Sequence, residues 1–136
     1  MRFFGILVAV FLLFGCSDSK KEVNLQNGEC DLNLQNCVVK FGEKSVEISL
    51  EPKPLRSMVP LSLRINGLDD EYKNLKAHIY GLNMDMGTIK ADLIKKGGVY
   101  IGNIVVSSCV TTMKYRLELF ESDKSLGISV DFVLEN

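Results

Sequence analysis

Apolar side chains alternate with polar ones along most of the chain after Cys37, the pattern of strands that are buried on one face. No segment after residue 16 keeps an apolar stripe at the 3.6-residue spacing of a helix. The pattern therefore predicts seven or eight short β-strands. Their alternating apolar positions span residues 46–50, 59–65, 75–79, 89–93, 99–106, 113–119 and 128–134.

Turn-forming residues separate these runs. Pro52 and Pro54 stand between strands and Pro60 near the start of one, where a missing N–H is tolerated. Paired glycines at the end of 95–98 predict a tight hairpin, because glycine adopts positive φ without strain. Polar residues and a glycine predict a further turn over 121–127.

The number and spacing of the strands favour one antiparallel β-sandwich of immunoglobulin-like type over residues 30–136. Two hallmarks of antibody domains are missing. The chain has no tryptophan, and Cys30 and Cys37 are too close in sequence to join two sheets.

The N-terminus has a continuous apolar pattern instead of an alternating one. A positive start at Arg2 precedes an apolar run over residues 3–15. A helix of that length spans roughly 20 Å, less than the ~30 Å of a membrane interior, so the run predicts a signal peptide. Its ending, Leu-Phe-Gly-Cys at 13–16, resembles the lipobox of bacterial lipoproteins. The resemblance implies cleavage before Cys16 and acylation of that cysteine; the alternative is an ordinary signal peptide with a coincidental cysteine.

Removing 15 of the 136 residues leaves 121, enough for a single hydrophobic core. Residues 16–29 are mostly polar and predict a flexible tether between the lipidated Cys16 and the domain. We therefore expect a protein anchored by lipid to a membrane of the bacterial cell envelope, with its domain facing the periplasm or the exterior. Because acyl chains supply the anchorage, the domain needs no membrane-binding surface of its own.

Charge and motifs narrow the function classes. The formal charge of −1 becomes −2 without Arg2, and acidic and basic residues are mixed along the chain, so no nucleic-acid footprint is present. His78 is the only histidine, and the sequence contains no nucleophile elbow, zinc-protease motif, P-loop or dinucleotide fingerprint. A dyad of Cys109 and His78 is left open without positive support. We therefore expect a binding or structural protein and not an enzyme.

The cysteines after the anchor divide by context. Cys30 and Cys37 lie seven residues apart, and an oxidising envelope favours a disulfide between them. The closed loop would stabilise the domain by about 2.5 kcal/mol. The alternative is a metal site, but this spacing is uncommon for zinc and no second Cys/His pair accompanies it. Cys109 is left unpaired.

The segment 81–87 contains Met84 and Met86 between two glycines. In an extended backbone their side chains point to one side, about 6.5–7 Å apart. Thioethers suit Cu(I), and Cys109 and Met113 form a second soft pair of equal parity. The four residues predict a soft-metal site. The alternative is packing, because methionine fills irregular gaps and an unpaired cysteine behaves as a small apolar residue.

Two polar residues near this segment are expected to have ordinary roles. Asp85 is expected to point outward or to bond to nearby backbone, as aspartate does in loops. His78 lies on the opposite face of its strand from Ala77 and Ile79, and is expected to be a solvated surface histidine and not a ligand.

Together these motifs resemble a group of poorly characterised proteobacterial envelope proteins. Their pattern combines a short Cys-x(6–7)-Cys loop, a Pro-rich passage, a Gly-x-(Asp/Asn)-Met-x-Met-Gly segment, and a later cysteine with methionine four residues on. The matching residues here are Cys30 and Cys37, 52–54, 81–87, and Cys109 with Met113. More distantly, the Met-x-Met-Gly element is similar to the YtkA-like and FixH-like immunoglobulin-fold domains.

The second resemblance implies a role in copper handling or oxidase maturation. The chain lacks the histidines that surround the methionines in the most metal-rich of those domains, which favours a sulfur-only Cu(I) site. Two functions stay open. One is a lipoprotein that binds or delivers a soft metal such as Cu(I). The other is a structural or adaptor lipoprotein that presents its sandwich to an envelope protein partner without a metal.

Overall fold

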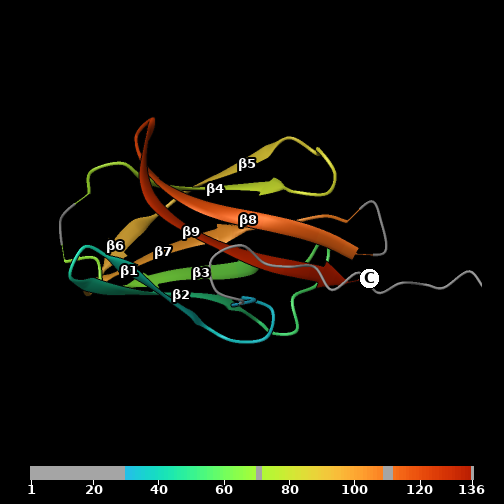
Figure 1. The fold of residues 1–136 in the computed structure, drawn as a ribbon, viewed down its shortest axis with the longest axis horizontal. Helices are drawn as coiled ribbons and strands as arrows, with labels where there is room; N and C mark the ends of the chain where they lie inside the picture. The colour runs from blue at the N-terminus through green and yellow to red at the C-terminus, as the bar shows by residue number, and fades with distance from the viewer. Residues whose placement is uncertain (1–29, 70–71, 109–111, 136) are drawn as a thin grey trace, which may run out of the picture.

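The computed structural model describes residues 30–69, 72–108 and 112–135. These residues form nine strands in two antiparallel sheets that pack face to face (Figure 1), which confirms the predicted β-sandwich. The strands are β1 (Cys37–Phe41), β2 (Lys44–Glu51), β3 (Leu61–Asn66), β4 (Leu75–Gly81), β5 (Thr88–Asp92), β6 (Ile94–Lys96), β7 (Val99–Ile104), β8 (Thr112–Glu121) and β9 (Lys124–Glu135).

The predicted signal peptide, the predicted lipidation site Cys16 and the predicted tether all lie outside the described residues. Within the ranges that are described, no helix is long and apolar enough to cross a membrane.

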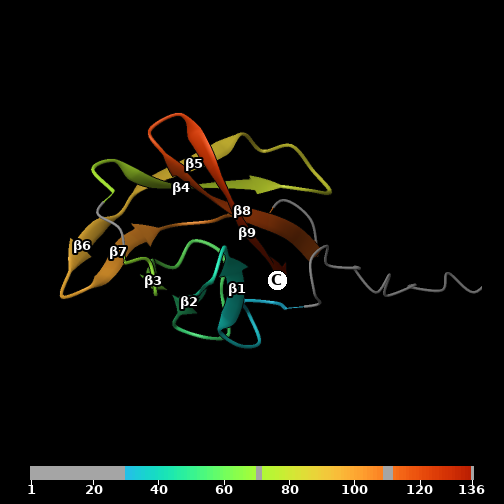
Figure 2. The same cartoon turned by 60° about the vertical axis from the view of Figure 1, so that its left-hand side comes forward.

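The two sheets contain strands β1-β2-β3-β7-β6 and β5-β4-β8-β9, in that order, and Figure 2 shows them as two layers. The chain changes sheet between β5 and β6, at Leu93. This buried residue donates its backbone N–H to the carbonyl oxygen of Leu75 at 2.9 Å. A change of sheet at one residue leaves the alternation of side chains almost intact. For this reason the sequence pattern did not predict β6.

The core lies between the sheets and is built from the predicted alternating positions. Ile48, Leu63, Ile79, Leu117 and Phe132 represent the central strands, and each is fully buried. Burying a side chain of this size stabilises a fold by about 1.5–3 kcal/mol, so repeated inward positions hold the two layers together.

Several boundaries differ from the sequence prediction. Strand β1 was not predicted, because it is an edge strand and its Val38 faces solvent. Strand β3 begins at Leu61 and not at residue 59. The predicted turn over 121–127 contracts to residues 122–123, where Ser122 adopts a φ of 54° and the register of the β8–β9 pair shifts nearby. Phe120 and Glu121 still pair with Ser125 and Lys124 beyond the shift, so β9 begins at Lys124 and includes most of the predicted turn.

Connections of different kinds gather at the two ends of the sandwich (Figure 1). The hairpin end carries the turns 42–43, 97–98 and 122–123, together with the longer connection from β3 to β4. The disulfide end carries the loops 30–36, 52–60, 82–87 and 105–108. The predicted glycine hairpin is confirmed at the hairpin end, where Gly97 and Gly98 have φ values of 59° and 83°.

Candidate functional site

The 82–87 loop, which contains Met84 and Met86, connects β4 to β5 at the disulfide end. It does not continue β4 as an extended strand, because the backbone bends at residues 82–84. The bend brings the loop back over the end of β4, and a Cβ atom on Gly81 would overlap the carbonyl oxygen of Met84. Close approach of backbone to backbone therefore explains the glycine at this position.

The side chain of Asn83 fastens this loop to β8. Its Nδ2 donates to the carbonyl oxygen of Thr112 at 2.9 Å, and its Oδ1 accepts from the N–H of Lys114 at 3.0 Å. The N–H of Leu82 donates to the carbonyl oxygen of Lys114 at 2.8 Å. Sequence analysis included Asn83 only as the Asp/Asn position of the 81–87 motif and did not predict its partners, which lie about 30 residues away in sequence.

The structure places three of the four predicted ligand residues near Gly81 and Tyr115 at the disulfide end, Met86 and Met113 by their side chains and Met84 by its backbone carbonyl. Met113 Cε lies 2.8 Å from the position that a Cβ on Gly81 would take. Met86 Sδ lies 3.9 Å from the hydroxyl oxygen of Tyr115. We call this group of residues the methionine corner.

The three methionines differ in exposure. Met84 is 39% exposed, Met86 packs partly buried against the core, and Met113 is fully buried. The segment that contains Met84 and Met86 is not an extended strand, so the spacing expected for an extended backbone does not apply. The bend after β4 leaves Met84 towards solvent while Met86 reaches the core.

Tyr115 connects the methionine corner to the segment that precedes Cys109. Its buried ring stacks on Phe132 with centroids 5.3 Å apart, and its hydroxyl donates to the carbonyl oxygen of Ser107. The chain two residues before Cys109 therefore lies beside the residue that contacts Met86. Cys109, the fourth predicted ligand, lies outside the described residues.

The donors at this corner are neutral sulfurs. Over 30–69, 72–108 and 112–135, no group of three His, Cys, Asp or Glu side chains could hold a metal ion. Asp85 is exposed, and its Oδ1 accepts from the N–H of Gly87 at 2.9 Å, as predicted for an aspartate in a loop. Thioethers favour Cu(I) over hard cations, which prefer oxygen ligands.

His78 lies away from the methionines, on the outer face of the four-stranded sheet. Its ring stacks on Phe120 with centroids 3.9 Å apart, and its buried Nε2 has no hydrogen-bond partner among the described residues. Burial, reinforced by the charge of Lys90, lowers the pKa of His78 from its ordinary value of 6.5. The side chain faces outward as predicted. The residue is partly exposed on the surface, but its ring is not fully solvated because Phe120 stacks on it.

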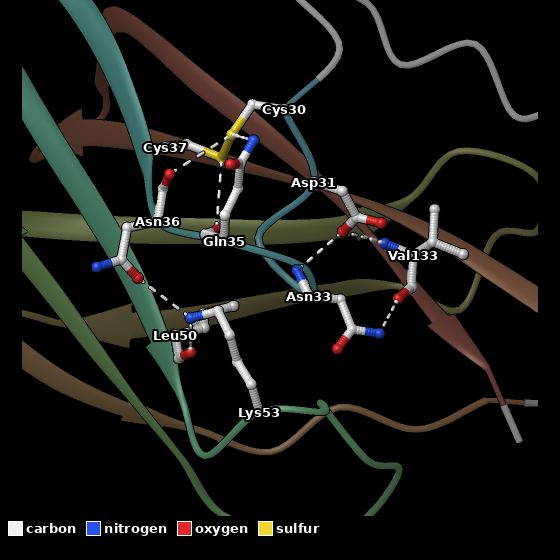
Figure 3. Close-up of a disulfide and its surroundings, with 9 residues drawn as sticks. All are labelled: Cys30, Asp31, Asn33, Gln35, Asn36, Cys37, Leu50, Lys53 and Val133. Carbon is white, nitrogen blue, oxygen red and sulfur yellow. Dashed lines mark hydrogen bonds between the residues drawn. A yellow bond between two sulfur atoms is a disulfide. The ribbon is translucent and has the colours of Figure 1, made fainter.

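Cys30 and Cys37 form the predicted disulfide, with their Cα atoms 5.9 Å apart (Figure 3). Both sulfurs are used in this bond, which excludes the zinc alternative for the pair. The predicted pairing is therefore confirmed, and it encloses a short loop at the disulfide end.

Residues inside this loop occupy the free edge of β9 (Figure 3). Asp31 Oδ1 accepts from the N–H of Val133 at 3.1 Å, and Asn33 Nδ2 donates to the carbonyl oxygen of Val133 at 2.8 Å. The N–H of Leu32 donates to the carbonyl oxygen of Asp131 at 3.2 Å. The loop thus satisfies backbone groups that an uncovered edge strand would leave open. Sequence analysis predicted the disulfide but not these partners.

A buried ion pair lies next to this edge. Asp131 is 2% exposed and receives two hydrogen bonds from Arg116, at 2.9 Å from Nε and 3.1 Å from Nη2. The hydrogen bond to Asp131 is the main reason that the pKa of Arg116 is raised. The pair joins β8 to β9 on the outer face and has no direct contact with the methionines among the described interactions.

Comparison with protein-family models, with curated proteins and with solved structures finds no match to this chain. The resemblances inferred from short motifs therefore stay predictions, and the fold and the geometry of the methionine corner carry the functional argument.

Proposed function

We propose that this protein is a lipid-anchored protein of the bacterial cell envelope whose methionine corner binds Cu(I), in copper handling or in oxidase maturation. One observation supports the metal site above all others. Met86 and Met113 come from two segments about 30 residues apart in sequence, and their side chains lie beside Tyr115 and Gly81, where the backbone of Met84 also returns.

Each methionine would contribute differently to Cu(I) binding. Met84 is exposed and would meet an incoming ion first. Met86 Sδ lies 3.9 Å from the Tyr115 hydroxyl oxygen, a contact weak enough to exchange for a metal bond. Met113 lies underneath and would complete a sulfur set with limited water access. Cys109, as a thiolate, would be the strongest ligand of the four predicted residues.

Anaerobic titration of the mature protein with Cu(I), against a chromophoric chelator, tests the metal site. Met84→Leu/Met86→Leu should weaken Cu(I) binding by about tenfold or more, which corresponds to about 1.4 kcal/mol. Leucine keeps the volume and removes the sulfur, so the fold should be retained. Met58→Leu is the matched control, because Met58 is an exposed methionine of another loop at the same end. Equal Cu(I) affinity in the double variant and in the wild type would reject the site.

A second function is favoured by the burial of two methionines. Met113 is fully buried and Met86 packs against the core, as expected of residues that fill space. Under this alternative the protein is a structural or adaptor lipoprotein that presents its loops to an envelope protein partner. Met84→Leu/Met86→Leu would then leave both partner binding and the cellular phenotype unchanged.

A further inference from the structure

Exposed apolar side chains concentrate at the disulfide end. Among the described residues, seven large hydrophobic side chains are exposed, and two of these, Val38 and Ile94, lie on strands of the five-stranded sheet. The other five belong to the loops of the disulfide end. They are Leu34 (79% exposed), Met58 (70%), Leu82 (37%), Met84 (39%) and Val105 (44%).

Hydrogen bonds join two of these loops to their neighbours. The N–H of Leu55 donates to Asn33 Oδ1 at 2.6 Å, which connects the 52–60 loop to the disulfide loop. The N–H of Met58 donates to the carbonyl oxygen of Val106 at 2.8 Å, which connects it to 105–108. The loops that carry Leu34, Met58 and Val105 are therefore joined to one another.

The 82–87 loop is joined to these loops through Tyr115 of β8. Tyr115 bonds to Ser107 and contacts Met86, so the 82–87 loop lies beside 105–108. The loops of this end are thus joined to one another at the end where the first described residue, Cys30, is located.

The backbone at Met58 supports a role for these loops. Met58 has a φ of 62°, the left-handed region that bulky residues rarely adopt. Such strain persists where surrounding structure holds it, and it collects at sites of function. Here it accompanies a methionine side chain that is 70% exposed and fills no space in the core.

The position of the predicted anchor identifies what these loops contact. The predicted tether of residues 16–29 ends at Cys30, and even a fully extended chain of that length spans at most about 50 Å. A flexible chain of that length averages about 20 Å from end to end. Acyl chains on Cys16 would therefore hold the disulfide end, and not the hairpin end, close to the lipid.

Charges at this end are mixed. Arg56 is exposed within the same loop as Met58, and Asp85 is exposed in the 82–87 loop. The exposed apolar side chains, and not charge, therefore support contact with the headgroup region of a bilayer.

We propose that the disulfide end rests on the bilayer that holds the lipid anchor, with Leu34, Met58 and Val105 in the headgroup region. This inference rests on the lipid anchoring in the proposed function and is independent of Cu(I) binding. It replaces the expectation that the domain needs no membrane-binding surface. The anchor retains the protein at the membrane, and the apolar loops set the orientation of the domain.

The absence of tryptophan from the sequence permits a direct test. Single tryptophans are placed at the disulfide end (Leu34→Trp and Met58→Trp) and, as matched controls, in exposed turns of the hairpin end (Glu43→Trp and Asp123→Trp). Each lipidated full-length mature protein is reconstituted into phosphatidylcholine and phosphatidylglycerol vesicles, with or without brominated acyl chains. Bromine quenches indole fluorescence on contact and so reports penetration.

Brominated lipid should quench Leu34→Trp and Met58→Trp by about half, because interfacial side chains lie about 5–10 Å deep, and should leave both controls unchanged. Equal quenching at the two ends, or none in vesicle-bound protein, would overturn the inference and leave the loops to a protein partner. Mass spectrometry of the mature chain separates the two proposals. An unacylated Cys16 would reject the anchor and this orientation together, whereas failed Cu(I) binding would leave the orientation intact.

Discussion

The two ends of the sandwich join the same kind of strand pair in different ways. At the hairpin end, the antiparallel neighbours β1–β2, β6–β7 and β8–β9 are joined by two-residue turns. At the disulfide end, β2–β3 and β4–β5 are also antiparallel neighbours, but residues 52–60 and 82–87 connect them. Two residues suffice for such a connection, so pairing does not explain the extra length.

The side chains of the two ends differ as well. The short turns of the hairpin end carry glycine and charged residues such as Glu43 and Asp123. The longer loops carry exposed methionine and leucine, among them Met58 and Leu82. Loops positioned by a rigid scaffold are where proteins bind their partners. Both proposed binding functions therefore use the disulfide end, which also carries the disulfide and the closely packed Gly81.

Removing the disulfide should have the largest effect. Cys30→Ala/Cys37→Ala should lower the free energy of unfolding by about 2–4 kcal/mol, because the opened loop no longer covers the edge of β9. Equilibrium unfolding in urea measures the loss, and wild-type protein in reductant is the control. Hydrogen exchange should rise at Val133 and stay unchanged at Asp123, which distinguishes the two ends. A loss below about 0.5 kcal/mol would contradict the edge-covering role.

A pair of glycine substitutions compares the ends directly. Gly81→Ala should cost about 2 kcal/mol of unfolding free energy, because its Cβ would overlap the Met84 carbonyl oxygen and displace the loop. Gly97→Ala should cost only about 1 kcal/mol, because its φ is positive but its Cβ would meet nothing within 4 Å. Thermal unfolding of both variants shows which substitution lowers the stability more. The reverse order would mean that the 82–87 loop yields more easily than the tight turn.

The smallest effect is expected on the sheet face between the ends, at His78. Burial against Phe120 and the charge of Lys90 lower its pKa below 6.5, with Glu118 as an opposing influence. Because the unfolded chain then binds the proton more readily, the stability contributed by neutral His78 is present above about pH 6.5. It is lost as the pH falls through the lowered pKa of the folded state.

The pH dependence can be measured with a variant that keeps the ring stack. His78→Phe should flatten the decline of the unfolding free energy between about pH 7 and pH 5 without changing its value strongly at pH 7.5. Lys76 and Asp123 also influence the pKa of His78, in opposite directions. An identical decline in wild type and variant would assign the pH dependence to other groups.

Local pattern predicted much of the fold. The inward positions at Ile48, Ile79 and Leu117 follow from alternation alone, because a strand puts every second side chain into the core. Alternation did not predict the structure correctly where the chain changes sheet or bends. It missed β6, which follows the change of sheet at Leu93, and it does not describe Met84 and Met86, because the backbone bends at residues 82–84.

The candidate site was predictable in composition but not in arrangement. Its methionines were recognisable as soft ligands from residue type alone. The role of Asn83 in holding their loop, and of Tyr115 in joining it to Ser107, depends on residues about 30 positions apart. A single sequence contains no signal for such a contact.

The sequence by itself determined the class of fold, the disulfide and the polar turns, because periodicity, short chain separation and glycine chemistry are local properties. The tertiary structure decided which loops share an end, that Asp31 and Asn33 cover the edge of β9, and that apolar tips surround the start of the domain. These properties arise when distant strands pair and bring their connections together. The physical reason is that local preferences specify elements, whereas the packing of two sheets specifies neighbours.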